Sequence, residues 1–222
     1  MHIPDGFLSP PVWAAAAVVS AGVVGVAVRK VGASAEEKQV PLMGVVGAFI
    51  FAAQMVNFPI ASGTSGHLLG SVLAALLLGP WAATLIMTAI LIVQALLFQD
   101  GGIAALGANI LNMGLLGAVG GFFVFRLLRR LLPGTRGTLI STFVTCWLVV
   151  VASSVLASVE IALSGTVPLA VVLPAMGGVH ALIGLAEGLI TTAAFAFILK
   201  TRADLVDPAC RPFLRGRSGA AA

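Results

Sequence analysis

The first two residues of the chain offer three nitrogen atoms in a row. A free amine on Met1 followed by histidine supplies the α-amine, the main-chain amide of His2 and the ring Nδ1 of His2. Once the amide is deprotonated, these atoms close fused five- and six-membered chelate rings around one cation, all in one plane. Initiator methionine is usually removed only before a small residue, so we expect Met1 to be retained before the large His2.

A histidine later in the chain can supply a fourth nitrogen and complete a square. His67 ends the loop Ser62-Gly63-Thr64-Ser65-Gly66, whose glycines allow close backbone approach. Four nitrogens in one plane suit Ni²⁺ or Cu²⁺. Taken singly, His2 fits a surface residue and His67 a polar group hydrogen-bonded inside a bundle. Together they predict a metal site formed by Met1, His2 and His67.

The residues after His2 support burial of this site. The stretch 3–8 reads Ile-Pro-Asp-Gly-Phe-Leu, which is mostly apolar, contains a rigid proline and has a turn signal at Asp5-Gly6. A free tail would be more polar. We therefore expect the N-terminus to fold back and plug a helical bundle from outside.

Four further polar residues are candidates for supporting roles. Asn109 and Gln94 are expected to orient a ligand histidine by hydrogen bonding, with ordinary bundle packing as the alternative. His180 and Glu187 lie seven residues apart, on one face of the last apolar segment. That pair is compatible with a structural hydrogen bond, a proton relay or an intramembrane metalloenzyme.

The composition shows what kind of protein must position these residues. Of the 222 residues, 59% are hydrophobic and 9% charged, whereas a soluble domain carries about 25% charged residues. The mean hydropathy is +1.12. These values exclude a soluble enzyme, a nucleic-acid-binding protein and a disordered chain. They predict an all-α, polytopic protein of the lipid bilayer.

The apolar runs predict seven transmembrane helices. We place them at 11–29, 41–58, 67–79, 80–98, 107–130, 138–163 and 176–199. The third is too short to cross hydrocarbon alone, since its helix would be about 20 Å long. The loop before it, 59–66, must therefore dip into the protein.

The basic residues fix the expected orientation. If all seven segments cross, all twelve Lys and Arg fall on one face, because they occur only around 29–38, 126–136 and 200–217. The positive-inside rule then places the N-terminus outside and the C-terminus in the cytoplasm. Basic charge follows the first apolar run instead of preceding it, so no cleavable signal is expected. We divide the chain into a membrane domain at 1–200 and a basic cytoplasmic tail at 201–222.

Several motifs resemble one family of membrane proteins. They are Met1-His2-Ile3-Pro4-Asp5-Gly6-Phe7-Leu8, Gly63-Thr64-Ser65-Gly66-His67-Leu68-Leu69-Gly70 with Gly79-Pro80, Gln94-Ala95-Leu96-Leu97-Phe98 with Asp100-Gly101-Gly102, Leu106-Gly107-Ala108-Asn109 with Asn112-Met113-Gly114, and His180-Ala181-Leu182-Ile183-Gly184 with Glu187-Gly188. With these motifs the chain resembles the cobalt/nickel substrate-binding (S) components of energy-coupling-factor (ECF) transporters, the CbiM/NikM family. The resemblance extends to about residue 199.

The resemblance implies a subunit of the bacterial or archaeal plasma membrane that captures Ni²⁺, or Co²⁺, as transported substrate. It implies Met1, His2 and His67 as ligands, and Gly66 and Leu68 beside His67 favour the nickel branch. It also implies a transmembrane T component, two cytosolic ATPases and a small accessory membrane subunit as partners.

The sequence itself contains no GxxxxGK[ST] motif, so we expect no ATPase activity and no enzymatic reaction. The alternative is a self-sufficient secondary transporter or channel for a divalent metal. That class would require paired repeats around a midplane site, and the sequence has no internal repeat.

Overall fold

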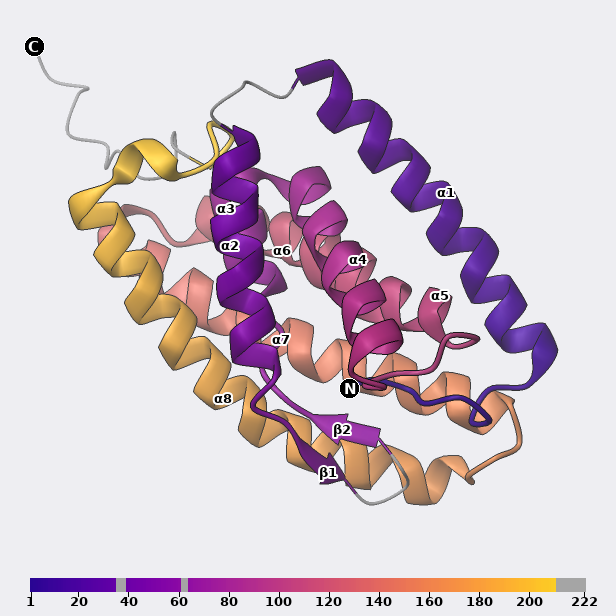
Figure 1. Ribbon diagram of the computed structural model, residues 1–222. Coiled ribbons are helices and arrows are strands. Elements are labelled where there is room, and N and C mark those ends of the chain that lie inside the picture. Colours follow the sequence, from indigo (N-terminus) through magenta and orange to yellow (C-terminus); the bar gives the residue numbers. More distant parts are fainter. Residues whose placement is uncertain (35–38, 61–63, 211–222) are drawn as a thin grey trace, which may run out of the picture.

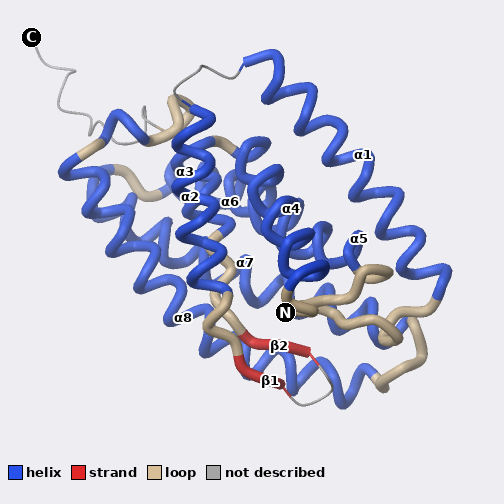
Figure 2. Tube along the Cα trace, viewed as in Figure 1, coloured by secondary structure: helices blue, strands red, loops and turns tan. Residues whose placement is uncertain are grey.

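The computed structural model describes residues 1–34, 39–60 and 64–210, and these are almost entirely helical (Figures 1 and 2). The main helices are α1 (Pro10–Ser34), α2 (Gln39–Gln54), α3 (Ser71–Leu78), α4 (Pro80–Leu97), α7 (Gly134–Leu163) and α8 (Leu169–Thr201). Between α4 and α7, α5 (Leu106–Asn109), the π-helix η1 (Ile110–Gly120) and α6 (Gly121–Leu131) follow without a break and form one rod. The rods lie where the hydropathy pattern predicts helices.

Membrane-spanning capacity differs between these rods. Five of them are long and apolar enough to cross a bilayer: α1, α4, the α5–η1–α6 rod, α7 and α8. Helix α2 is apolar but shorter, with 16 residues. Helix α3 has 8 residues, about 12 Å of helix. The protein is a multi-pass membrane protein in which α3 does not cross on its own.

Helix α3 forms the centre of the bundle. All eight of its residues are buried, and it contacts α2, α4, η1, α6, α7 and α8. A helix that is apolar on every side is stable only when other helices surround it completely. The helix begins at Ser71 rather than at His67, so the expected start of the third segment is wrong by four residues. Residues 67–70 instead form an irregular link that is hydrogen-bonded to Glu187 of α8.

The loop before α3 contains a small hairpin that the sequence did not predict. Strands β1 (Phe58–Ile60) and β2 (Thr64–Gly66) pair antiparallel, with Pro59 opposite Ser65. Figure 1 shows the hairpin beside α8, at the same end of the bundle as the N-terminus. The predicted dip of this loop into the protein is present, because Thr64 and Gly66 are buried.

Helices α7 and α8 pack closely against each other at two glycines. A Cβ atom at Gly184 would lie 3.1 Å from Trp147, and one at Gly188 would lie 2.8 Å from Phe143. Small residues of this kind let membrane helices approach each other. Helix α8 begins at Leu169, seven residues before its expected start at 176, and it includes Pro174 in its second turn.

The far end of the bundle is closed by the segment after α8. A short 3-10 helix, η2 (Ala203–Leu205), leads to Asp207, whose backbone N–H donates to Leu76 O at 3.0 Å. Val206 and Cys210 are fully buried. Residues 203–210, the first part of the predicted tail, therefore cover the end of α3. The rest of the predicted tail, 211–222, lies outside the described residues.

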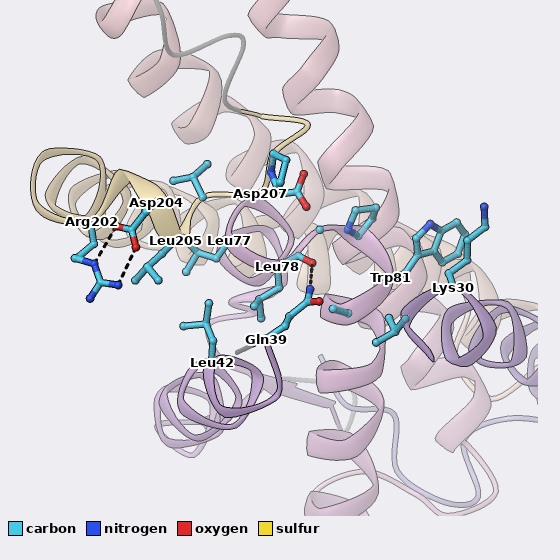
Figure 3. Close-up of a pocket in the computed structure, with 16 residues that line it drawn as sticks. Lys30, Gln39, Leu42, Leu77, Leu78, Trp81, Arg202, Asp204, Leu205 and Asp207 are labelled. Carbon is cyan, nitrogen blue, oxygen red and sulfur yellow. Dashed lines mark hydrogen bonds and ion pairs between the residues drawn. The ribbon is translucent and has the colours of Figure 1, made fainter. Parts of the chain in front are cut away.

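A cavity of about 680 Å³ lies beside this segment (Figure 3). Its lining includes Lys30 from the end of α1, Trp81 from the start of α4 and Arg202 after α8. Gln39 spans part of it and donates to Leu78 O at 3.3 Å. Basic side chains from distant parts of the sequence thus line opposite sides of one cavity, at the end of the bundle away from the N-terminus.

Candidate metal site

The N-terminal segment lies inside the bundle. Met1 and Ile3 are fully buried, and His2 is 2% exposed. Asn109 holds the main chain of Ile3 at both sides: its Oδ1 accepts from Ile3 N at 2.9 Å and its Nδ2 donates to Ile3 O at 3.1 Å. The N–H of Gly102 donates to the same Ile3 oxygen at 2.9 Å. Insertion of the N-terminus, expected from its apolar residues, is therefore present.

Two further contacts fix the segment after the turn. The carboxylate of Asp5 accepts from Ile103 N at 3.0 Å and from Ala104 N at 2.8 Å. Thr166, between α7 and α8, donates to Phe7 O at 2.7 Å. The first residues of the chain are thus held by loop 98–105, by α5 and by the loop between α7 and α8.

The three nitrogens proposed for the terminal chelate face one point. Ser65 Oγ, on β2, lies 3.3 Å from the Met1 amine, 3.3 Å from the His2 amide and 3.3 Å from His2 Nδ1. The Met1 amine also donates to the Ser65 carbonyl. The three nitrogens that a tridentate chelator would use therefore lie around one side-chain oxygen.

A chain of amides determines which nitrogen of His2 carries the proton. Gln54 Nε2 donates to Leu69 O at 2.6 Å, and a carbonyl can only accept. Gln54 Oε1 therefore accepts from Gln94 Nε2 at 3.1 Å, and Gln94 Oε1 is left to accept from His2 Nε2 at 3.0 Å. The proton thus resides on Nε2, which leaves the Nδ1 lone pair free to bind a cation.

An acidic side chain faces the same Nδ1. Asp100 Oδ1 lies 3.1 Å from His2 Nδ1, and its Oδ2 accepts from Asn57 Nδ2 at 2.7 Å. With the proton of His2 on Nε2, the lone pair of Nδ1 faces a carboxylate. This pairing repels unless positive charge lies at that point, which makes it suitable for a cation.

His67 lies against His2, with their ring centroids 4.4 Å apart and their planes 24° apart. Its Nδ1 is 2.7 Å from Leu68 O and must donate to it. Its Nε2 therefore carries a lone pair, and this buried atom has no hydrogen-bond partner among the described residues. The His67 ring therefore stacks on the His2 ring and does not meet it edge-on.

Burial removes protons from this cluster. It lowers the pKa of the Met1 amine to about 4, against a partial opposing effect of Asp100. Burial likewise lowers the pKa of His2, and it lowers that of His67 well below the usual value, helped by the nearby Met1 amine and His2. Burial raises the pKa of Asp100, but contacts with His2 and the amine outweigh it, and the net shift is downward. Near neutral pH the nitrogens are free of excess protons and the carboxylate is charged.

The four residues predicted to have supporting roles, Gln94, Asn109, His180 and Glu187, do not all contact the cluster. Gln94 contacts His2, as expected for an orienting residue, whereas Asn109 holds the main chain of Ile3. His180 and Glu187 are not joined by a hydrogen bond: His180 Nδ1 lies 2.8 Å from Met176 O, and Glu187 accepts from Leu69 N at 2.5 Å and Gly70 N at 2.9 Å.

Sequence reasoning missed Ser65, Gln54 and Asp100 as parts of this cluster. Ser65 and Asp100 lie in the sequence motifs that also contain His67 and Gln94. Gln54 is an amide at the end of an apolar helix, which is itself a signal of function. Gly63, in the loop motif, lies outside the described residues. In the described part of the chain, no three His, Cys, Asp or Glu side chains come together as a metal site. The candidate site combines two rings with main-chain nitrogens.

Comparison with known proteins gives a consistent result. The family model described as the cobalt uptake substrate-specific transmembrane region, CbiM, matches residues 2–205. The chain is 39% identical to a putative fused nickel transport protein of Archaeoglobus fulgidus, over 96% of this chain and 70% of that protein. It is 38% identical to a putative metal transport protein of Haloquadratum walsbyi, over 93% of each.

Solved structures agree with these sequence relatives. The crystal structure of a transition metal transporter is similar at a TM-score of 0.85 and 34% identity, covering 96% of this chain and 97% of that one. A truncated transition metal transporter is similar at a TM-score of 0.84 and 36% identity, covering 90% of this chain and 99% of that one.

Proposed function

Because the chain belongs to the CbiM family of cobalt and nickel transport proteins, we propose that it is the S component of an ECF transporter. In this role it captures extracytoplasmic Ni²⁺, or Co²⁺, and passes the ion inward when docked to its partners. Nickel is the favoured substrate, since a planar set of four nitrogens suits Ni²⁺ and several relatives are named as nickel transport proteins.

One observation carries the ligand assignment: Ser65 Oγ lies 3.3 Å from each of the three terminal nitrogens. A cation near this point binds the Met1 amine, the His2 amide and His2 Nδ1 together. His67 then turns out of its stack with His2 and offers its unpartnered Nε2 as the fourth ligand. Binding of the cation thus brings the His67 ring onto the terminal chelate.

Charge balance supports the same assignment. A divalent cation in a buried site requires nearby negative charge, because desolvation of an unpaired ion is costly. The deprotonated His2 amide contributes one negative charge, and Asp100, 3.1 Å from His2 Nδ1, contributes another. Together they neutralise the ion without a carboxylate in the ligand set.

The proposed topology has seven crossings, with the N-terminus outside and the C-terminus in the cytoplasm. Five rods are long enough to span by themselves. Helix α2 spans with the hairpin as its extension, and α3 completes its crossing through the link at 67–70 and the segment at 203–210. Lys30 and Arg202 line one cavity at the far end, which the positive-inside rule makes cytoplasmic.

Inward movement of the ion requires partners. The chain has no phosphate-binding loop for ATP, so we propose that a transmembrane T component and cytosolic ATPases supply the energy. A small accessory membrane subunit completes the assembly. We assign no enzymatic reaction to the chain, and both carboxylate oxygens of Glu187 bind backbone N–H groups.

Uptake of radioactive nickel by cells tests this function. Cells that express the chain with its T component and ATPases should accumulate the ion, and a catalytically dead ATPase should abolish uptake. The His67→Ala variant in the intact complex should also fail. Uptake by cells that express the chain alone contradicts the proposal and favours a secondary transporter or channel.

A further inference from the structure

The side chain of Glu187 binds the link that follows His67. Its Oε2 accepts from Leu69 N at 2.5 Å, and its Oε1 accepts from Gly70 N at 2.9 Å. Glu187 lies on α8 and is buried, and a buried carboxyl group requires hydrogen-bond partners to offset the loss of water. Two successive N–H groups of the link supply these partners. The link therefore presents both N–H groups to one side chain of α8.

The first of these two peptide groups also contacts the ring of His67. It joins Leu68 to Leu69, and in a trans peptide the C=O and the N–H point in opposite directions. The N–H donates to Glu187, whereas the oxygen, Leu68 O, lies 2.7 Å from His67 Nδ1. A carbonyl can only accept, so the proton of His67 resides on Nδ1. Glu187 thus holds the carbonyl that leaves His67 Nε2 with its lone pair.

The second peptide group acts in the same way on His2. It joins Leu69 to Gly70, and its N–H donates to the other oxygen of Glu187. Its carbonyl oxygen accepts from Gln54 Nε2 at 2.6 Å. This bond begins the series of amides that keeps the proton of His2 on Nε2 and leaves its Nδ1 free.

We propose that Glu187 is a positioning residue for both histidine ligands of the transported cation. This inference rests on the proposed function, which makes the two rings ligands. One side chain on α8 fixes two successive peptide groups, and their oxygens determine which nitrogen of each ring is free. His67 then presents Nε2, and His2 presents Nδ1, before the ion arrives. Glu187 acts through the main chain and is not itself a ligand.

Substitutions at Glu187 should weaken Ni²⁺ binding in a graded way. Glutamine keeps one acceptor oxygen, but its NH₂ group cannot accept, so Glu187→Gln holds one of the two peptide groups. Glu187→Leu holds neither. We expect the affinity to fall about 10-fold in Glu187→Gln and about 100-fold in Glu187→Leu.

Glu160→Gln is the matched control for these titrations. It makes the same change at another buried carboxyl group, which lies on α7 and accepts from Asn112 Nδ2 at 2.7 Å. Its described hydrogen bonds do not involve the link at 67–70. Glu160→Gln should therefore bind Ni²⁺ like wild type.

Nitrogen NMR of the metal-free full chain measures the proton positions themselves. The chain has three histidines, whose signals can be assigned by removing one at a time. Wild type should have the proton of His67 on Nδ1 and that of His2 on Nε2. In Glu187→Leu at least one of these two rings should populate the other tautomer. His180 is an internal control, because its Nδ1 donates to Met176 O within its own helix, and its tautomer should not change.

The two measurements separate positioning from a merely structural role. Unchanged tautomers in Glu187→Leu would overturn the proposal even if binding weakens, and so would an affinity equal to that of Glu160→Gln. Thermal unfolding identifies a variant that does not fold, in which case Glu187→Gln supplies both measurements. If the tautomers change as expected but wild type binds no Ni²⁺ tightly, the proposed function fails and the effect of Glu187 on the rings remains.

Discussion

The proton on His2 is positioned by a main-chain carbonyl more than sixty residues away in sequence. Leu69 O orients Gln54, Gln54 orients Gln94, and Gln94 accepts from His2 Nε2. No single pair in this series determines the tautomer of His2. Each glutamine amide could be rotated so that its oxygen and nitrogen exchange places, unless its next hydrogen-bond partner is fixed. The series makes His2 Nδ1 available to a cation before any cation arrives.

The Gln94→Leu variant tests this relay. Leucine keeps the bulk but removes the acceptor for His2 Nε2, so we expect Ni²⁺ affinity to fall by about 10- to 100-fold. Gln39→Leu is the matched control, because Gln39 also donates to a main-chain carbonyl, Leu78 O, but at the other end of the bundle. Isothermal titration should show normal affinity for Gln39→Leu. Equal affinities for both variants would exclude the relay.

The low pKa values of the site predict few protons released on metal binding. Burial lowers the pKa of the Met1 amine to about 4, so between pH 6 and 8 the folded protein has already lost this proton. Burial also lowers the pKa of His2 and of His67 from the usual histidine value. Only the His2 amide then gives up a proton, and affinity should rise by about tenfold for each pH unit.

Calorimetry in buffers of different ionisation enthalpy directly measures the number of protons released per Ni²⁺ bound. We expect about one proton released per Ni²⁺ at pH 7. An exposed N-terminus, with its usual pKa of about 7.7–8.0, would release the amine proton as well. A value of two or more at pH 7 would show that the amine is not buried as described.

The elements around the site depend on close backbone contacts. Loop 98–105 holds the N-terminal segment through Gly102, where a Cβ atom would lie 2.4 Å from Asp5 N and 2.3 Å from Asp5 Oδ1. No side chain fits there without moving the segment. The hairpin adds Ser65, and α8 holds the link at 67–70 through Glu187. The candidate metal site therefore combines the N-terminus, the hairpin, the link at 67–70 and loop 98–105.

The Gly102→Ala variant should displace the N-terminal segment and weaken Ni²⁺ binding by at least about tenfold, since the added methyl meets backbone atoms. Gly25→Ala, on α1, is the control, because nothing lies within 4 Å of a Cβ there. Both variants can be compared by titration and by thermal unfolding in the absence of metal. Wild-type affinity in Gly102→Ala would refute the tight contact.

The helices were predictable because their apolar runs are long, whereas the hairpin was not. Strands β1 and β2 have three residues each and include Pro59 and Gly66, so they carry no periodicity. The start of α3 was misplaced because residues 67–70 bond to Glu187, which is distant in sequence. Met1, His2 and His67 were candidates from their chemistry, and the structure places the three close together. Ser65, Gln54 and Asp100 join them only through tertiary folding.

The whole molecule has a polar end that holds the candidate site and a basic end that holds the cavity of Figure 3. Helix α3 lies between them and is closed at one end by the link to the hairpin and at the other by residues 203–210. This arrangement lets a short helix occupy the centre of a membrane bundle. It also places the Met1 amine and the basic residues on opposite faces of the proposed membrane.

Cysteine labelling in whole cells tests the orientation. In a variant lacking Cys146 and Cys210, Ile103→Cys should react with an impermeant thiol reagent, because Ile103 is 61% exposed at the outer end. Arg136→Cys should react only after permeabilisation. Native Cys210 is not a suitable probe, since it is fully buried. Reaction of Arg136→Cys in intact cells would reverse the proposed topology.

The most direct test of the proposed site compares Ni²⁺ titrations of two tagged proteins. One carries an additional residue before Met1, which moves the first nitrogen away from Ser65; the other carries a tag after Ala222. If the Met1 amine is a ligand, the extended protein loses tight binding, and the C-terminally tagged protein binds like wild type. Equally tight binding by the extended protein would contradict the account, because a site of two histidine rings alone would then be sufficient.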